Sequence, residues 1–127
     1  MAITGSAGKT SLKELIGQSL NTLIPTSYSK KSFNNQYGVP LSLFNIDKKH
    51  KIGVFEVGMD KKGEIDKLSS LIQPDIGVIT NISYAHIKNF NSIMGEHFWL
   101  IIRHTWLKQK KCTTIIQPHS SFSLPLS

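Results

Sequence analysis

The sequence predicts an α/β fold, in which a parallel sheet is covered by helices on both faces. Residues 52–57 and 76–79 are almost entirely apolar, without alternation, which is typical of strands that are buried on both sides. Segments with apolar residues at helical spacing lie between such runs, as they do where neighbouring strands of a sheet are parallel. A chain of 127 residues has room for one domain of this kind.

The N-terminal part of the chain predicts a strand, a tight loop and a helix. Residues 1–4 have the character of a strand end, and residues 5–8 that of a tight loop. A helix of about three turns starts near Ser11 and ends before Pro25. Its apolar residues recur at helical spacing, and they are Leu12, Leu15, Ile16, Leu20 and Leu23.

Four further elements follow along the chain. Residues 26–28 fit a short strand, and residues 41–46 favour a helix over a strand. The buried strand at 52–57 leads through a turn into a one-sided helix over 65–72, which Pro74 ends. The last buried strand, 76–79, runs directly into Thr80 and Asn81.

The pattern changes after Gly95. Residues 97–106 are apolar on nearly every side, residues 108–111 are basic, and residues 120–127 show no period. A basic amphipathic segment at a membrane surface would show an apolar stripe, which this part of the chain lacks. We therefore predict a domain over residues 1–95 and a tail over 96–127 that does not continue it, being either read out of frame or disordered.

The composition predicts a soluble, cytoplasmic protein. The net charge of +7 would attract nucleic acid, anionic lipid or a polyphosphate ligand. The basic residues are not interleaved with aromatic ones, so we expect solvated surface lysines and no nucleic-acid partner. No apolar run approaches the roughly 20 residues that span a bilayer, so no stable membrane insertion is expected. A single cysteine, Cys112, cannot form an internal disulfide, which agrees with a reducing compartment.

A phosphate-binding loop is the clearest motif. Residues 5–10, Gly5-Ser6-Ala7-Gly8-Lys9-Thr10, lie between a predicted strand and a predicted helix. Glycines let the backbone N–H groups turn inward, and the start of the helix adds positive potential. Lys9 is expected to reach the terminal phosphates, and Thr10 to offer its hydroxyl to Mg²⁺. The spacing is the short G-x-x-G-K-T, because the longer Walker pattern would need a glycine where the chain has Ile3.

Polar residues at the ends of the predicted strands are the next candidates. Glu56 lies at the carboxyl end of a buried strand, where open α/β sheets bind their ligands, and is predicted to complete a magnesium site. Asp60 is a weaker candidate, since turns often contain aspartate. Asn81 and His86 follow the next strand and are expected at the same edge. His97 and His104 lack a third ligand, so no metal site is predicted there.

These residues resemble the central ATP-binding domain of the Mur ligases, and within that family the branch that adds D-alanyl-D-alanine. The resemblance covers about residues 2–95 and rests on four motifs in order. They are Ile3-Thr4-Gly5-Ser6-Ala7-Gly8-Lys9-Thr10, then Asn34-Asn35-Gln36-Tyr37-Gly38-Val39-Pro40-Leu41, Phe55-Glu56-Val57-Gly58-Met59, and the run from Gly63-Glu64-Ile65 through Pro74-Asp75 to Asn81-Ile82-Ser83-Tyr84-Ala85-His86. It implies part of a P-loop-type parallel sheet with helices on both faces.

The resemblance also implies a reaction and its site residues. ATP would phosphorylate a carboxylate of UDP-MurNAc-tripeptide to an acyl phosphate, which the amine of D-Ala-D-Ala would attack to form an amide. The implied catalytic residues are Lys9, Glu56 and His86, and the implied magnesium ligands are Thr10, Glu56 and His86. The implied nucleotide-binding residues are Gly5, Ser6, Ala7, Gly8, Lys9, Thr10, Ser11 and Asn81. Asn34 and Asn35 would belong to the substrate cleft.

The tail departs from the family pattern. In the family, a helix with a carbamoylated lysine follows the stretch matched by residues 92–95, whereas here Glu96-His97-Phe98-Trp99 follows. The domains that bind the UDP-sugar and close on ATP are also unmatched. We therefore expect a fragment with little or no turnover, for which a separate chain carrying the missing domains would be a partner. The alternatives are a non-catalytic nucleotide-binding remnant of a broken gene, or another Mur or folylpolyglutamate-type ligase.

Overall fold

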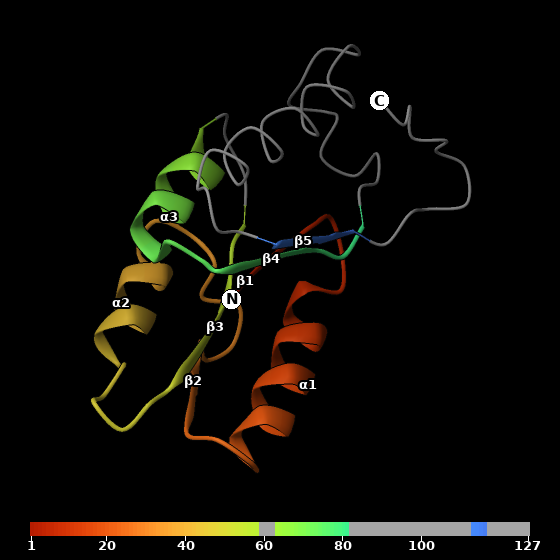
Figure 1. Cartoon of the computed structure of the whole chain (residues 1–127). Helices are drawn as coiled ribbons and strands as arrows, with labels where there is room; N and C mark the ends of the chain where they lie inside the picture. Colours follow the sequence, from red (N-terminus) through yellow and green to blue (C-terminus); the bar gives the residue numbers. More distant parts are fainter. Residues whose placement is uncertain (59–62, 82–112, 117–127) are drawn as a thin grey trace, which may run out of the picture.

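The computed structural model describes residues 1–58, 63–81 and 113–116, and it has the α/β architecture that the sequence predicts (Figure 1). In these segments, five parallel strands form a sheet with the order β2-β3-β1-β4-β5. The strands are β1 (Ala2–Thr4), β2 (Thr26–Tyr28), β3 (Ile52–Glu56), β4 (Ile76–Ile79) and β5 (Thr113–Ile116). The helices of the described segments are α1 (Lys9–Asn21), α2 (Gly38–Phe44) and α3 (Glu64–Ile72).

The first strand of the chain lies near the middle of the sheet. Ile3 of β1 is in register with Glu56 of β3 on one side and with Val78 of β4 on the other. Since all three strands are parallel, their carboxyl ends meet at one edge. The loop after β1 is therefore flanked by whatever follows β3 and β4.

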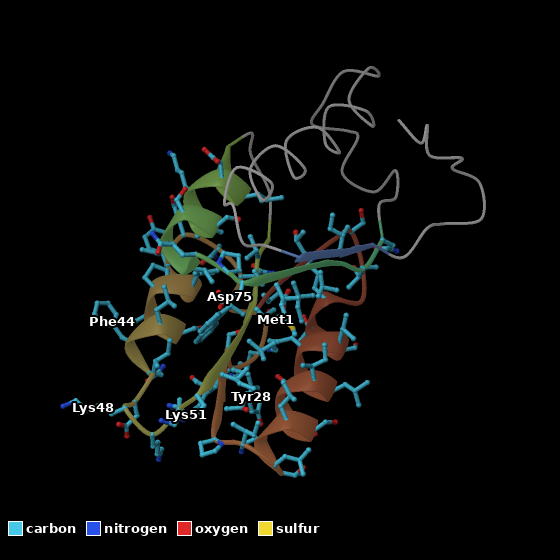
Figure 2. All side chains as sticks on the ribbon, in the orientation of Figure 1. Met1, Tyr28, Phe44, Lys48, Lys51 and Asp75 are labelled. Carbon is cyan, nitrogen blue, oxygen red and sulfur yellow. The ribbon has the colours of Figure 1, made fainter. Side chains whose placement is uncertain are left out.

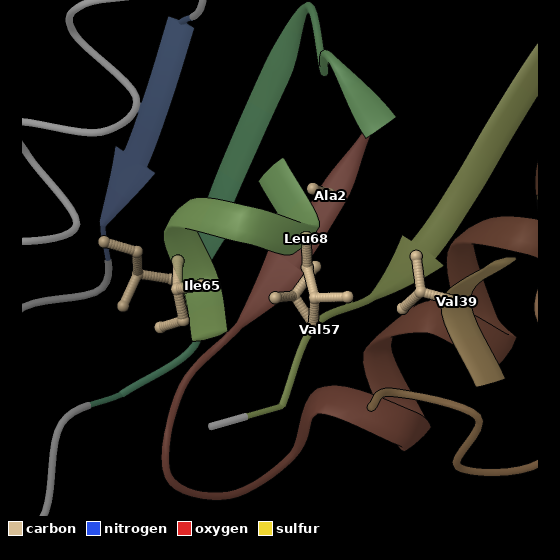
Figure 3. Close-up of a cluster of buried hydrophobic side chains, with 6 residues drawn as sticks. Ala2, Val39, Val57, Ile65 and Leu68 are labelled. Carbon is tan, nitrogen blue, oxygen red and sulfur yellow. The ribbon is translucent and has the colours of Figure 1, made fainter. Parts of the chain in front are cut away.

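Each face of the sheet is covered by helix (Figure 1). Successive residues of a strand point to opposite faces, so Ala2 and Ile3 belong to different apolar clusters. The cluster under α1 is centred on Ile3, Val54 and Val78, with Leu12, Ile16 and Leu20 packed against it. The cluster on the other face, shared with α2 and α3, comprises Ala2, Val39, Val57, Ile65, Leu68 and Ile79 (Figure 3). Helices on both faces are thus confirmed.

Details of the helices differ from the sequence prediction. In α1 the residues that pack on the sheet repeat every four positions, and Leu15, at 65% exposure, lies off that stripe. Leu23 lies beyond the end of α1 and is 82% exposed. Helix α2 is confirmed but starts at Gly38, so Pro40 lies in its first turn. Proline is tolerated there because N–H groups of a first turn have no intrahelical acceptor.

One strand comes from the segment beyond residue 95. Residues 113–116 form β5 and pair with β4 in parallel, with Val78 in register with Ile115. We did not predict this strand from the sequence, although Thr113-Thr114-Ile115-Ile116 is a run of β-branched residues, which favour strands. The domain boundary at residue 95 stays a prediction. In the described segments no helix is long and apolar enough to cross a membrane.

Candidate functional site

The predicted phosphate loop connects β1 to α1 and depends on two glycines. Gly5 has φ 137° and Gly8 has φ 77°, both in the region that residues with a side chain rarely adopt. A Cβ atom at Gly5 would lie 2.1 Å from the hydroxyl oxygen of Thr80, so only glycine fits there. At Gly8 nothing lies within 4 Å, and the requirement for glycine is one of backbone conformation alone.

The end of β4 holds this loop in shape. The Ser6 amide donates to the Asn81 carbonyl oxygen at 2.9 Å, and the Ala7 amide donates to Asn81 Oδ1 at 2.8 Å. The Thr80 hydroxyl donates to the Ala7 carbonyl at 2.6 Å. Asn81, predicted to line the nucleotide site, therefore lies against the loop and fixes its backbone. Thr80 was not singled out in the sequence, because its role depends on β4 being the neighbour of β1.

The side chain of Lys9 folds back over the loop. Its Nζ donates to the carbonyl oxygens of Gly5 at 2.7 Å and Ser6 at 3.5 Å. Lys9 also begins α1, whose first turn contains no acidic residue. The amides of a first helical turn lack intrahelical acceptors and carry positive potential. Ammonium and helix terminus together form a cationic end to the loop, which suits a phosphate group.

Thr10 and Glu56, which the sequence predicts as magnesium ligands, meet beside the loop. Glu56 ends β3, the direct neighbour of β1. Its Oε2 accepts a hydrogen bond of 2.8 Å from the Thr10 hydroxyl. Glu56 is only 1% exposed, and a buried carboxylate requires hydrogen-bond donors to offset its desolvation. Asn34 supplies a second one, because its Nδ2 donates to Oε1 at 2.8 Å.

These oxygen atoms fit a magnesium ion that is held together with nucleotide phosphates. Mg²⁺ prefers oxygen ligands and usually binds one or two carboxylates plus substrate phosphates, retaining several waters. The described residues contain no group of three or more His, Cys, Asp or Glu that would form an all-protein metal site. The site offers one buried carboxylate and one hydroxyl next to a loop that suits phosphate. This set fits a magnesium ion that takes its remaining ligands from nucleotide phosphates and water.

The other predicted site residues either form no hydrogen bond with Thr10 or Glu56 within the described segments, or lie outside those segments. Asn35 uses its Oδ1 to accept the amides of Tyr37 at 3.1 Å and Gly38 at 2.9 Å, at the start of α2. Ser11 is exposed on α1. Asp60, His86, His97 and His104 lie outside the described residues. The structure thus brings together Thr10, Glu56 and Asn34, and it places Lys9 at the end of the loop and Asn81 against it.

The chain is similar to proteins of known sequence and structure. A family model described as the Mur ligase middle domain matches residues 3–99. A curated relative, UDP-N-acetylmuramoyl-tripeptide–D-alanyl-D-alanine ligase of Buchnera aphidicola, is 44% identical over 95 residues, 75% of this chain and 21% of the relative. Among solved structures, MurF from Acinetobacter baumannii is similar with a TM-score of 0.74 and 31% identity, over 91% of this chain and 30% of that one.

A second similar structure contains a bound nucleotide. MurF ligase from Thermotoga maritima, in complex with ADP, is similar with a TM-score of 0.70 and 26% identity, over 91% of this chain and 31% of that one. The chain therefore spans about a fifth of the curated relative and about a third of the solved ligases.

Proposed function

The chain belongs to the Mur ligase family, whose middle-domain model matches residues 3–99, and we propose that its site binds Mg²⁺-ATP for the formation of an amide bond. The observation that carries the proposal is the contact between Thr10 and Glu56, 2.8 Å apart beside the phosphate loop. A hydroxyl and a buried carboxylate at that place are the ligands that a nucleotide-bound magnesium ion needs.

Each residue of the site has a part in this function. The amides of the first turn of α1 and the ammonium of Lys9 bind the phosphates and offset their charge. Thr10 and Glu56 would hold Mg²⁺, which would neutralise charge on the phosphoryl group. Asn34 orients the Glu56 carboxylate. Asn81 accepts hydrogen bonds from the amides of Ser6 and Ala7, and the Thr80 hydroxyl donates to the Ala7 carbonyl, so both residues fix the backbone of the loop. His86 is proposed to assist a second Mg²⁺, and Ser11 to lie near the nucleotide.

The relatives suggest which substrates the complete reaction uses. Their names describe ligation of D-alanyl-D-alanine to UDP-N-acetylmuramoyl-tripeptide, and we propose the same cytoplasmic reaction for the longer protein to which such a middle domain belongs. In it, the tripeptide carboxylate takes the γ-phosphoryl group of ATP to form an acyl phosphate and releases ADP. The amine of D-Ala-D-Ala then attacks the acyl carbon, loses a proton and displaces inorganic phosphate to form the amide. Asn34 and Asn35 are proposed to border the substrate cleft, where the Asn34 side chain bonds to Glu56 and the Asn35 side chain to the amides that start α2. The chain spans about a fifth of that relative, so for the chain alone we propose nucleotide binding without turnover.

The test of this proposal is the Mg²⁺ dependence of ADP and ATP binding by the 127-residue chain. We expect Glu56→Gln, which keeps the shape and removes the charge, to lower the affinity gained from Mg²⁺ by about tenfold or more, as loss of a metal ligand or its support commonly does. Affinity in EDTA is expected to change little, because the loop and Lys9 are untouched. Titration calorimetry with and without Mg²⁺ measures both quantities.

A matched control loses an equivalent charge elsewhere. Asp75 is exposed and precedes β4, at the opposite edge of the sheet from the loop (Figure 2). Asp75→Asn is expected to bind Mg²⁺-ADP as the unchanged chain does. Nucleotide binding that ignores Mg²⁺, or an equal loss in both variants, would contradict the proposal. Amide formation by the purified chain from the two substrates would overturn the assignment of binding without turnover.

A further inference from the structure

Lys13 is a buried charge that the proposed binding of nucleotide does not use. Its side chain is 0% exposed, and it lies on α1 one turn after Thr10. Lysine is almost never fully buried unless its ammonium group is paired, because removing the charge from water is costly. A purely structural position on a helix that covers a sheet would more simply hold an apolar residue. The contacts of the ammonium group therefore indicate what it does.

The ammonium group of Lys13 has two partners. It forms an ion pair with Glu14 Oε1 at 2.9 Å, and it donates a hydrogen bond to the backbone carbonyl of Lys31. Glu14 is the next residue on the same helix, so this ion pair ties α1 to nothing else. The Lys31 carbonyl belongs to the segment between β2 and α2. The tertiary connection made by Lys13 thus runs from the helix of the phosphate loop to that segment.

The segment of residues 29–35, here called the asparagine loop, reaches the candidate magnesium site. At its start, the Ser29 amide donates to the Val54 carbonyl at 3.1 Å. At its end, Asn34 donates through Nδ2 to Glu56 Oε1, and its carbonyl accepts the Gly58 amide at 2.7 Å. Both ends are therefore attached to β3 or to the residues that follow it.

The middle of the asparagine loop is held by Lys13. Lys31 has φ 51°, a left-handed conformation that residues other than glycine adopt rarely and only where their surroundings hold them. Its carbonyl is the atom that the Lys13 ammonium contacts. Asn34 follows Lys31 by three residues. When the backbone is fixed at Lys31, the position of Asn34 is fixed as well, and its side chain reaches Glu56.

We propose that Lys13 is a positioning residue, which fixes the asparagine loop through the Lys31 carbonyl so that Asn34 orients the magnesium-binding carboxylate of Glu56. This inference rests on the proposed function of the site. It couples the phosphate-loop helix to the metal ligand through a second route, beside the direct contact between Thr10 and Glu56. The ligand at this site is a divalent cation that is bound together with a nucleoside diphosphate or triphosphate.

The test uses Lys13→Met in the full chain, with ADP as the probe in Mg²⁺ and in EDTA. Methionine fills similar space without charge or donor. We expect the affinity gained from Mg²⁺ to fall about tenfold, the size of effect common for residues that support a metal ligand, while binding in EDTA is unchanged. Lys67→Met is the control, because Lys67 is an exposed lysine of α3. It is expected to behave as the unchanged chain.

Two further measurements separate positioning from general stability. Lys13→Met combined with Asn34→Ala is expected to lose no more Mg²⁺ dependence than Asn34→Ala alone, because Lys13 acts through Asn34. Without any ligand, Lys13→Met is expected to speed amide hydrogen exchange at Gly58, whose N–H donates to the Asn34 carbonyl, while amides of β1 and β4 keep their protection.

The outcomes are distinguishable from those for the proposed function. If the unchanged chain shows no Mg²⁺-dependent binding, the proposed function fails, and exchange at Gly58 still decides whether Lys13 holds the loop. Additive losses in the double variant, or unchanged exchange at Gly58, would overturn the inference. If Lys13→Met does not fold, Lys13→Arg decides. If Lys13→Arg keeps the Mg²⁺ dependence of binding, the positive side chain at position 13 is supported as the positioning group. If Lys13→Arg loses that dependence but binds normally in EDTA, the inference is contradicted.

Discussion

Gly5 and Gly8 both have positive φ angles, but their surroundings differ. A Cβ atom at Gly5 would lie 2.1 Å from Thr80 Oγ1 and 2.9 Å from the Asn81 carbonyl oxygen. At Gly8 it would meet nothing within 4 Å. Gly5 is therefore required both by backbone conformation and by the close approach of β4, whereas Gly8 is required by conformation alone.

Alanine substitution at the two glycines tests this difference. We expect Gly8→Ala to lower the free energy of unfolding by about 1 kcal/mol, since the left-handed conformation disfavours a side chain. Gly5→Ala is expected to cost about 3 kcal/mol or more, because overpacking adds to the conformational cost. Urea unfolding followed by circular dichroism measures both values. Equal losses in the two variants would show that the contact with Thr80 is relieved easily.

Helix α3 shows how the sheet selects one face of an element. Leu68 is 4% exposed and packs in the cluster with Ala2 and Ile65 (Figure 3), whereas Leu71, on the same helix, is 51% exposed. The sequence pattern groups both leucines with the apolar face of the helix. Which of them is buried depends on how α3 lies against the sheet and α2, and helical spacing alone does not determine that.

The two leucines provide a matched pair of substitutions. Leu68→Ala is expected to lower the free energy of unfolding by about 3 kcal/mol, because it removes buried apolar surface and leaves a cavity. Leu71→Ala is expected to change it by no more than about 0.5 kcal/mol, as is usual for exposed positions. Thermal and urea unfolding of the two variants check the prediction. A large effect at Leu71 would indicate that another part of the chain covers it.

β5 is the outermost of the described strands on the β4 side of the sheet. It pairs with β4 through four residues, Thr113 to Ile116, and so covers an edge that would otherwise present unpaired backbone groups. The predicted domain of residues 1–95 leaves this strand out. If the domain ends at residue 95, residues 113–116 do not contribute to its stability. If β5 belongs to the folded sheet, they do.

Shortened chains distinguish these two possibilities. A chain ending at residue 112 is expected to unfold at lower urea concentration than the full chain, because the edge of β4 loses its partner. A chain ending at residue 117 keeps β5 and is the control, expected to match the full chain. The same urea midpoint for all three would support a domain that ends near residue 95 and would count against a stabilising role for β5.

The sequence by itself determined the class of fold, the loop and most of the elements. Apolar runs without alternation can be buried only between two layers, and helical spacing between them supplies those layers. The glycines at positions 5 and 8, followed by Lys9 and Thr10, also specified a phosphate loop, since that motif is local in the chain and needs no knowledge of which strands are neighbours. Strand β5 was not predicted because four β-branched residues carry a weak signal in a tail without periodicity.

Only the tertiary structure decided which residues meet. Glu56 reaches Thr10 because β3 is the neighbour of β1, and Asn81 reaches the loop because β4 is the neighbour on the other side. The order of strands in a sheet is not encoded in the spacing of residues along the chain. The sequence also could not predict the contact of Asn34 with Glu56 or that of Lys13 with the Lys31 carbonyl. A buried polar group finds its partner through packing between elements that are distant in the sequence.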